Sequence, residues 1–177
     1  MKNSSLKIVP RVILDNWYES HITELIINKN LQSSLGRQLA QLAKKHEFDG
    51  FVVDIWSAFA AQQKVHAIEI IRKIYAYFKK NKLLLILIVP APIHSGDRVG
   101  SFAREDAEKL SPFVDGFSLI AYNYSSIQRP GPNSPIKWVE KCIKLLAPKK
   151  SSLIRKKVVC RPQFSRLRLL ANWRSCN

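Results

Sequence analysis

Four short apolar segments, separated by stretches with helical periodicity, constrain the fold of this chain most strongly. The segments cover residues 8–14, 51–56, 83–89 and 117–122 and run without strict apolar–polar alternation. Continuous runs of Val, Ile, Leu and Phe are typical of strands buried on both faces of a parallel sheet. The stretches between them place apolar residues at three- and four-residue steps, as amphipathic helices do. The order therefore predicts a succession of βα units. The predicted helices cover residues 31–45, 64–80, 105–110 and 136–146.

Two architectures fit this order, and the turn after the first predicted strand separates them. A doubly wound nucleotide-binding fold needs a glycine-rich turn there, whereas Asp15-Asn16-Trp17-Tyr18 follows in this chain. A (β/α)₈ barrel needs no such turn, but a complete one takes about 250 residues, and this chain has 177. We therefore expect an α/β fold that is a partial (β/α)₈ TIM barrel of about four to five parallel βα units.

The expected domain boundary lies near residue 159. Residues 1–159 form the partial barrel, and residues 154–160 offer a fifth strand. Residues 160–177 form a basic tail without a turn and helix in the expected register, so we expect the tail to be poorly ordered. A basic helix that binds nucleic acid or a membrane is the alternative interpretation of this tail.

The charge of the chain is strongly positive, with a formal net charge of +16. In the body the bases are scattered and show no basic stripe interleaved with aromatic residues, so we expect a solvated surface and no nucleic-acid partner. Three cysteines and four histidines have spacings that match no metal or redox motif, which predicts no metal and no cofactor.

Targeting signals are sparse in this sequence. Residues 1–17 contain no apolar stretch of signal-peptide length. No apolar run approaches the roughly 18 residues that a membrane-spanning helix requires. We expect no membrane span, and a chain with this N-terminus is expected to stay inside the cell.

The residues that follow the predicted strands are rich in aromatic and polar side chains. In a parallel barrel the functional residues lie at the carboxyl ends of the strands. Aromatic rings stack on the apolar faces of sugars while polar neighbours bind the hydroxyls, so a carbohydrate site is plausible. Packing of Trp56 and Tyr122 in the core is the alternative interpretation. The candidate binding residues are Trp17, Asp54, Trp56, Tyr122 and Asn123, with Tyr124 as a weaker candidate.

Two of these strand ends resemble motifs of glycoside hydrolase family 18. The segment FDGFVVDIW resembles the family's DGxDxDxE signature, with Asp54 at the second inner aspartate and Trp56 at the glutamate. Val52 replaces the first inner aspartate. The segment DGFSLIAYNYS resembles a second motif with an MxYDY core, in which Asn123 replaces the aspartate. Together with VPRVILDNW and the run PGPN before Trp138, these motifs are similar to one chitinase-like branch of the family.

The resemblance implies that the four predicted strands correspond to barrel strands three to six. It also implies that strands one, two, seven and eight and a signal region are missing. In the family the glutamate protonates the leaving oxygen while the substrate's acetamido group attacks the anomeric carbon. An indole cannot act as this acid, so Trp56 predicts a protein that is not an enzyme. The expected ligand is a chitin-type or amino-sugar oligosaccharide.

The same resemblance implies a biological setting: a lysosomal or secreted protein linked to innate immunity, with a scavenger-type receptor as a further partner. Two alternatives remain open. One is a truncated variant without an independent function, since a half barrel exposes two sheet edges. The other is a weak hydrolase with Asp54 as an unusual acid.

Overall fold

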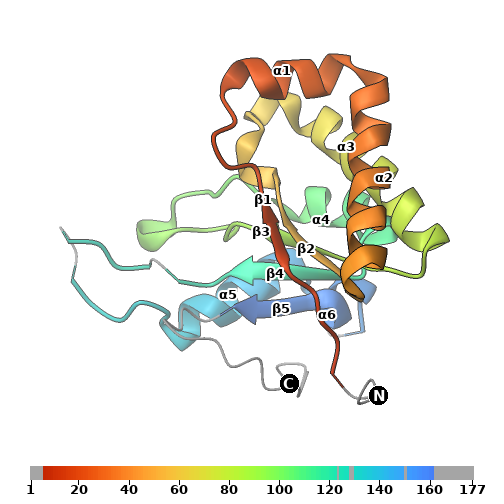
Figure 1. The fold of residues 1–177 in the computed structure, drawn as a ribbon. Coiled ribbons are helices and arrows are strands. Elements are labelled where there is room, and N and C mark those ends of the chain that lie inside the picture. The colour runs from red at the N-terminus through yellow and green to blue at the C-terminus, as the bar shows by residue number, and fades with distance from the viewer. Residues whose placement is uncertain (1–5, 123, 128–129, 150, 162–177) are drawn as a thin grey trace.

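The structure is a computed structural model that describes residues 6–122, 124–127, 130–149 and 151–161. One parallel sheet of five strands, with helices packed against one side, forms the molecule (Figure 1). In chain order the elements are β1 (Arg11–Ile13), α1 (Glu19–Ile27), α2 (Lys29–His46), β2 (Gly50–Asp54), α3 (Lys64–Lys80), β3 (Leu84–Val89), α4 (Arg104–Leu110), β4 (Gly116–Ile120), α5 (Ile136–Leu146), α6 (Leu153–Lys157) and β5 (Val158–Arg161).

The strands lie side by side in chain order, and every neighbouring pair is parallel. Sequential parallel strands with helical crossovers are the arrangement of an open segment of a (β/α)₈ barrel. The predicted α/β fold of four to five parallel βα units is confirmed.

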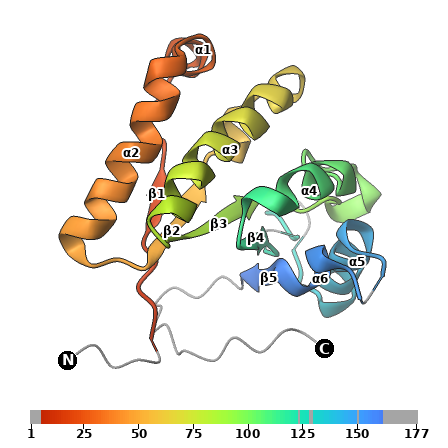
Figure 2. The same ribbon diagram turned by 90° about the vertical axis from the view of Figure 1, so that its right-hand side faces the viewer.

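The helices pack on the side of the sheet that we call the helix side (Figure 2). Phe51, Val53, Leu85 and Leu87 point to this side and are at most 2% exposed. Burial of such side chains contributes about 1.5–3 kcal/mol each, so this layer holds the fold together. The opposite side of the sheet would face the interior of a barrel, and we call it the inner face.

The inner face is only partly covered. Ile13 is 51% exposed, although it lies in a strand. Its register partner Asp54 lies on the same face, because paired residues of parallel strands point the same way. This half-open face is where the carboxyl ends of the strands present their side chains.

The repeated sequence Asp-Gly-Phe starts two of the strands and has a structural role in each. Asp49 Oδ2 accepts a hydrogen bond from the backbone N–H of Ile8 at 2.8 Å. In the same way, Asp115 Oδ2 accepts from the backbone N–H of Leu85 at 2.8 Å. Each carboxylate therefore ties the start of its strand to the preceding strand in the sheet.

Two elements lie outside the sequence prediction. Helix α1 was not predicted, and it precedes α2, whose first turn is capped by the Asn28 side chain. Near the C-terminus, the segment expected to be a strand begins as α6 and becomes β5 only at Val158. Cys160 and Arg161, assigned to the tail by the sequence, therefore belong to the sheet. The rest of the predicted tail, residues 162–177, lies outside the described residues.

Candidate functional site

The candidate site lies at the carboxyl edge of the inner face, where the five parallel strands end together. Strand pairing fixes which side chains share a level. Asp54 of β2 stands level with Ile13 of β1, and one step below it Val52 stands level with Arg11. On β3 and β4 the corresponding positions are Ile88 and Ser118. Asp54 is therefore a carboxylate in a largely apolar surface.

Arg11 is the partner of this carboxylate. Its guanidinium Nη2 donates to Asp54 Oδ2, and the two side chains are 44% and 16% exposed. Sequence reasoning missed Arg11 because it considered only residues at strand ends. A charged residue within an apolar strand, two positions before the level of Asp54, is the signal that could have identified it. The pair adds a cationic donor to the site beside the predicted acceptor.

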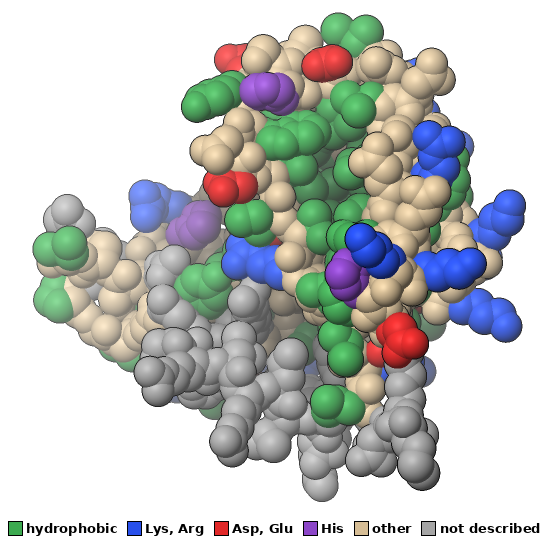
Figure 3. All heavy atoms as spheres, in the orientation of Figure 1, with side chains coloured by type: hydrophobic (Ala, Val, Ile, Leu, Met, Phe, Trp, Pro, Cys, Tyr) green, Lys and Arg blue, Asp and Glu red, His purple; other side chains and the backbone are tan. Residues whose placement is uncertain are grey.

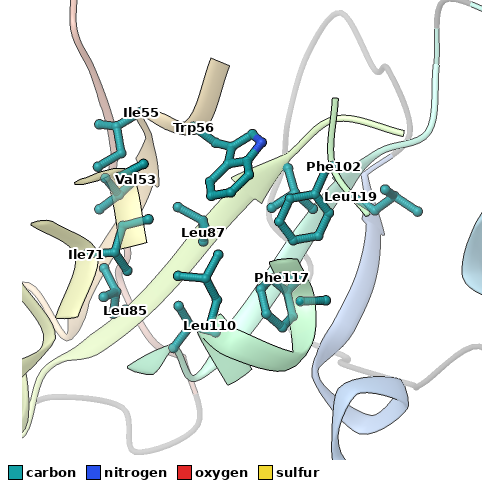
Figure 4. Close-up of a cluster of buried hydrophobic side chains, with 14 of the residues drawn as sticks. Val53, Ile55, Trp56, Ile71, Leu85, Leu87, Phe102, Leu110, Phe117 and Leu119 are labelled. Atoms are coloured by element: carbon teal, nitrogen blue, oxygen red, sulfur yellow. The ribbon is translucent and has the colours of Figure 1, made fainter. Parts of the chain in front are cut away.

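Trp56 occupies a different place from the one expected for a sugar-stacking residue. Its side chain is 2% exposed and packs edge-on against Phe102, with ring centroids 5.1 Å apart. Figure 4 shows the indole next to Leu87 and Phe102, in the core on the helix side. In this structure the indole therefore offers no free face to a sugar.

The backbone explains why Trp56 leaves the inner face. Strand alternation from Asp54 would return residue 56 to the inner face. However, β2 ends at Asp54, and Ile55 has φ −123° and ψ −15°, which is not an extended conformation. A 3₁₀ turn over Trp56–Ala58 follows. The change of backbone conformation turns the indole toward the core.

A cation and a carboxylate cover the outer side of this indole. Lys64 Nζ lies 5.6 Å from the centre of the Trp56 ring and donates to Asp106 Oδ2 at 2.7 Å. The same carboxylate oxygen accepts from the backbone N–H of Ala103 at 2.9 Å and so starts α4. Trp56 is thus packed into a fixed structural cluster.

The other two aromatic candidates lie at the carboxyl edge and are partly exposed. Trp17 follows β1 and packs near His21, with ring centroids 6.0 Å apart, and Tyr122 follows β4. Strands β1 and β4 are separated by two strands, so at about 4.8 Å per strand step the two sides of the edge are about 14 Å apart. The structure therefore places these rings on different sides of the site. Asn123 lies outside the described residues.

The loop after β4 is tied back to the strand end. Ser134 Oγ donates to the backbone carbonyl of Ala121, and the Tyr124 N–H donates to the carbonyl of Asn133 at 3.1 Å. The ring of Tyr124 lies 5.2 Å from that of the buried Trp138. Tyr124 therefore helps to anchor this loop beside the candidate site.

The described residues contain no cluster of three or more His, Cys, Asp or Glu side chains that could hold a metal ion. Within the same part of the chain, the helices are all too short or too polar to cross a membrane. A hollow of about 660 Å³ lies along α1, lined by exposed residues including Glu19, Thr23 and Asn28. That hollow lies along the helix that follows the carboxyl end of β1. The groups described at the carboxyl edge are suited to hydrogen bonding and ring stacking.

One sequence-family model and several solved structures match this chain. The sequence model described as Glycosyl hydrolases family 18 matches residues 1–166. Among solved structures, a class V chitinase from Pseudomonas fluorescens Pf-5 has a TM-score of 0.69 at 19% identity, covering 88% of this chain and 49% of that one. A mutant family 18 chitinase from Cycas revoluta in complex with (GlcNAc)4 has a TM-score of 0.69 at 13% identity, with 89% and 49% covered.

A third similar structure is an immunomodulatory active chitinase from Trichuris suis, with a TM-score of 0.67 at 17% identity and coverage of 88% and 46%. At these identities the likeness concerns the fold. The chain spans about half the length of the solved structures that it matches.

Proposed function

Because the chain belongs to glycosyl hydrolase family 18, we propose that it binds an oligosaccharide of the chitin or amino-sugar type without hydrolysing it. The observation that carries this proposal is the burial of Trp56, which the resemblance to the family's DGxDxDxE signature puts in the place of the acid. Its side chain is an indole packed in the core. Neither its chemistry nor its position lets it protonate a glycosidic oxygen.

The proposed binding site uses the carboxyl edge of the inner face. Asp54 accepts a hydrogen bond from a sugar hydroxyl or amide, because Arg11 occupies Oδ2 and leaves Oδ1 available. Arg11 supplies further N–H donors to sugar oxygens. Trp17 and Tyr122 stack on apolar sugar faces at the two sides of the edge, and Asn123 adds a polar contact. Trp56 enters this proposal as the core residue that supports the site from the helix side.

Within the family, we infer that the chain belongs to the branch of chitinase domain-containing protein 1, the stabilin-interacting chitinase-like protein. The motifs VPRVILDNW, FDGFVVDIW and VDGFSLIAYNYS support this inference. Membership of this branch would imply a lysosomal or secreted protein that is linked to innate immunity and has a scavenger-type receptor as partner.

A second candidate is a variant with no sugar-binding function of its own. The exposure of Ile13, a strand residue on the inner face, favours this alternative. Partly covered apolar surface and the outer edges of β1 and β5 would promote association with other chains. A weak hydrolase that uses Asp54 is the third candidate.

Titration of the 177-residue chain with (GlcNAc)4 tests the proposal. We expect measurable heat of binding, and Asp54→Asn and Arg11→Gln should each weaken the affinity at least about tenfold, because each change removes a hydrogen bond between a charged group and the sugar, which contributes about 1.5–3 kcal/mol. Asp97→Asn, a change at an exposed carboxylate paired with Lys141, is the matched control and should leave the affinity unchanged.

The three candidates give different outcomes in this experiment. Absence of heat with a well-folded parent chain would favour the variant without a sugar-binding function. Release of fluorophore from a chitobioside substrate, abolished by Asp54→Asn, would favour the hydrolase. Binding that is unaffected by both Asp54→Asn and Arg11→Gln would contradict the proposed site while leaving sugar binding intact.

A further inference from the structure

Lysines concentrate where α2 and α3 end, at the amino ends of the strands. We call this group the lysine end. The last turn of α2 carries Lys44 and Lys45, and the last turn of α3 carries Lys79 and Lys80. Lys82 follows in the turn before β3, and all five side chains are exposed. Basic residues in a last helical turn interact favourably with the helix dipole. That interaction accounts for lysines at each helix end separately, but not for five lysines gathered at one end of the sheet.

Helix packing brings the two halves of the lysine end together. α2 and α3 approach closely at Gly36, where an added Cβ would lie 2.9 Å from Tyr77 Cδ2 and 3.2 Å from Ile74 Cα. Both helices then run on to the same end of the sheet, as Figure 2 shows. A hollow of about 570 Å³ there is lined by residues of both, including Lys44, Phe48 and Asn81. Lys44 lines this hollow, and Lys80 and Lys82 flank Asn81 in the chain, so the ends of both helices meet at one hollow.

These lysines lack acidic partners. Within the described part of the chain, lysines elsewhere form ion pairs, as Lys29 does with Glu69 and Lys141 with Asp97, but no ion pair involves any of the five at the lysine end. In Figure 3, Lys and Arg side chains gather over α2 on the right of the molecule. Among the described residues that line the hollow, Glu47 is the acidic one. The lysine end is therefore a surface of concentrated net positive charge.

We propose that the lysine end binds a sulfated polysaccharide. Flexible ammonium groups on two helix ends can each meet a separate sulfate along an extended chain, and lysine acts as a compact point charge that needs no fixed geometry. Single-stranded nucleic acid would require exposed aromatic rings for base stacking. Among the described residues the exposed large hydrophobic side chains include one aromatic, Tyr18, which lies before α1 rather than at the lysine end.

The lysine end and the proposed oligosaccharide site lie at opposite ends of the sheet. Lys44 and Lys45 precede the start of β2, whereas Asp54 is its last residue. A polysaccharide at the lysine end would therefore leave the carboxyl edge open, and it could anchor the protein to a sulfated matrix. This inference does not depend on the proposed function of the inner face.

Binding of a heparin-derived dodecasaccharide to the 177-residue chain tests the proposal. We expect the quadruple change Lys44→Gln, Lys45→Gln, Lys79→Gln and Lys80→Gln to weaken binding at least tenfold in about 0.15 M salt, and to reduce its dependence on salt, because fewer charges are then screened. The matched control neutralises four exposed lysines elsewhere by Lys109→Gln, Lys137→Gln, Lys144→Gln and Lys149→Gln. The control has the same net charge and should bind within about threefold of the parent.

Two further ligands complete the experiment. The desulfated dodecasaccharide should bind at least tenfold more weakly than the sulfated one, and a single-stranded RNA of equal charge should also bind more weakly. Equal losses in the two quadruple variants would show that net charge alone drives binding and would overturn the proposal. RNA binding as tight as that of the sulfated chain would overturn the assigned ligand class. Circular dichroism of each variant establishes that the fold is retained.

Discussion

Trp56 lies where β2 passes into a 3₁₀ turn, and its neighbours determine what the side chain can do. Phe102 meets the indole edge-on, and Lys64 lies above the ring. Edge-on aromatic pairs contribute about 0.5–1.5 kcal/mol beyond the buried area, and cation–π contacts add to this. The indole therefore stabilises the fold, and the proposed site beside it has to rely on other groups.

If Trp56 serves the core and Trp17 serves the proposed site, alanine substitution should affect the two tryptophans differently. Trp56→Ala should lower the free energy of unfolding by about 3–5 kcal/mol, because it leaves a large cavity in the core. Trp17→Ala, which removes a partly exposed ring, should cost clearly less stability but weaken (GlcNAc)4 binding more. Urea unfolding followed by circular dichroism measures the first effect, and calorimetric titration the second. The reverse order of the two stability effects would contradict the burial of Trp56.

Cys142 offers a pH-dependent test of the core. Burial raises the pKa of the Cys142 thiol to about 11 from an ordinary value of 9.0. Folding thus favours the neutral thiol, so its contribution is complete below pH 9. The contribution is lost as the pH rises from 9 to 11, because the unfolded chain releases the proton first. Two pKa units correspond to at most about 3 kcal/mol.

The measurement compares the free energy of unfolding of the parent chain and of Cys142→Ala at pH 8 and pH 10.5. The parent should lose more stability over this range than the variant, which lacks the titrating thiol. Cys160→Ala, which removes a partly buried thiol, serves as the control and should behave like the parent. An identical pH dependence in the parent and Cys142→Ala would show that the thiol is not held neutral.

Sequence reasoning proposed Asp54 as a site residue but did not find the side chains that determine its environment. Alternation along an ideal strand places residue 56 beside residue 54. A local backbone change at Ile55 removes that relation, and no periodicity reports such a change. Arg11 was missed for a related reason, since only the strand register brings it next to Asp54.

The two Asp-Gly-Phe strand starts look equivalent in sequence but differ in packing. Gly50 has φ +155°, and a Cβ built on it would lie 2.1 Å from the carbonyl oxygen of Leu84. A Cβ on Gly116 would meet its nearest neighbour, the carbonyl oxygen of Lys157, at 3.5 Å. The first glycine is needed for close approach of β2 and β3, whereas the second has room for a methyl group.

Alanine substitution should therefore separate the two glycines. Gly50→Ala has to move the backbone of a neighbouring strand and should cost at least about 3 kcal/mol of stability, from the overlap together with the strained φ. Gly116→Ala should change stability by less than about 1 kcal/mol. Thermal melting of both variants, followed by circular dichroism, measures the difference. Equal losses would contradict the register between β2 and β3.

Among the elements, the long ones were predicted well because their periodicity is strong. Helices α3 and α5 begin and end where the pattern places them. Helix α1 is short, with only Ile22 and Leu25 buried, so its apolar stripe is weak. In the segment of α6 and β5, a helical turn and a strand share one apolar run, and periodicity cannot divide so short a stretch.

The molecule as a whole has one well-packed side and one partly open side. The core on the helix side is continuous from α1 to α6, with residues such as Leu25, Phe78 and Ile154 at most 8% exposed. The inner face keeps Ile13 half-exposed. Since one connected cluster of buried side chains joins the helices to the sheet, the stability of the chain should rest on that single core.

A single core predicts cooperative unfolding of the 177-residue chain. Loss of helix, measured by circular dichroism, and exposure of the buried Trp56 and Trp138, measured by fluorescence, should follow the same urea curve. The parent should give one transition, and Asp54→Asn, which loses the charged pair with Arg11, should lower its midpoint while the two curves still coincide. Transitions with clearly different midpoints would mean that the chain does not unfold as one cooperative unit, and would favour the variant without an independent function.

The proposal that the inner face binds an amino-sugar oligosaccharide without cleaving it is tested most directly by the fate of (GlcNAc)4 in contact with the folded chain. Saturation-transfer nuclear magnetic resonance on a mixture of the two should show transfer to the acetamido and ring protons of the sugar, and chromatography of the same sample after prolonged incubation should return intact (GlcNAc)4. Shorter products that disappear with Asp54→Asn, or the absence of transfer from a cooperatively folded chain, would contradict the proposal.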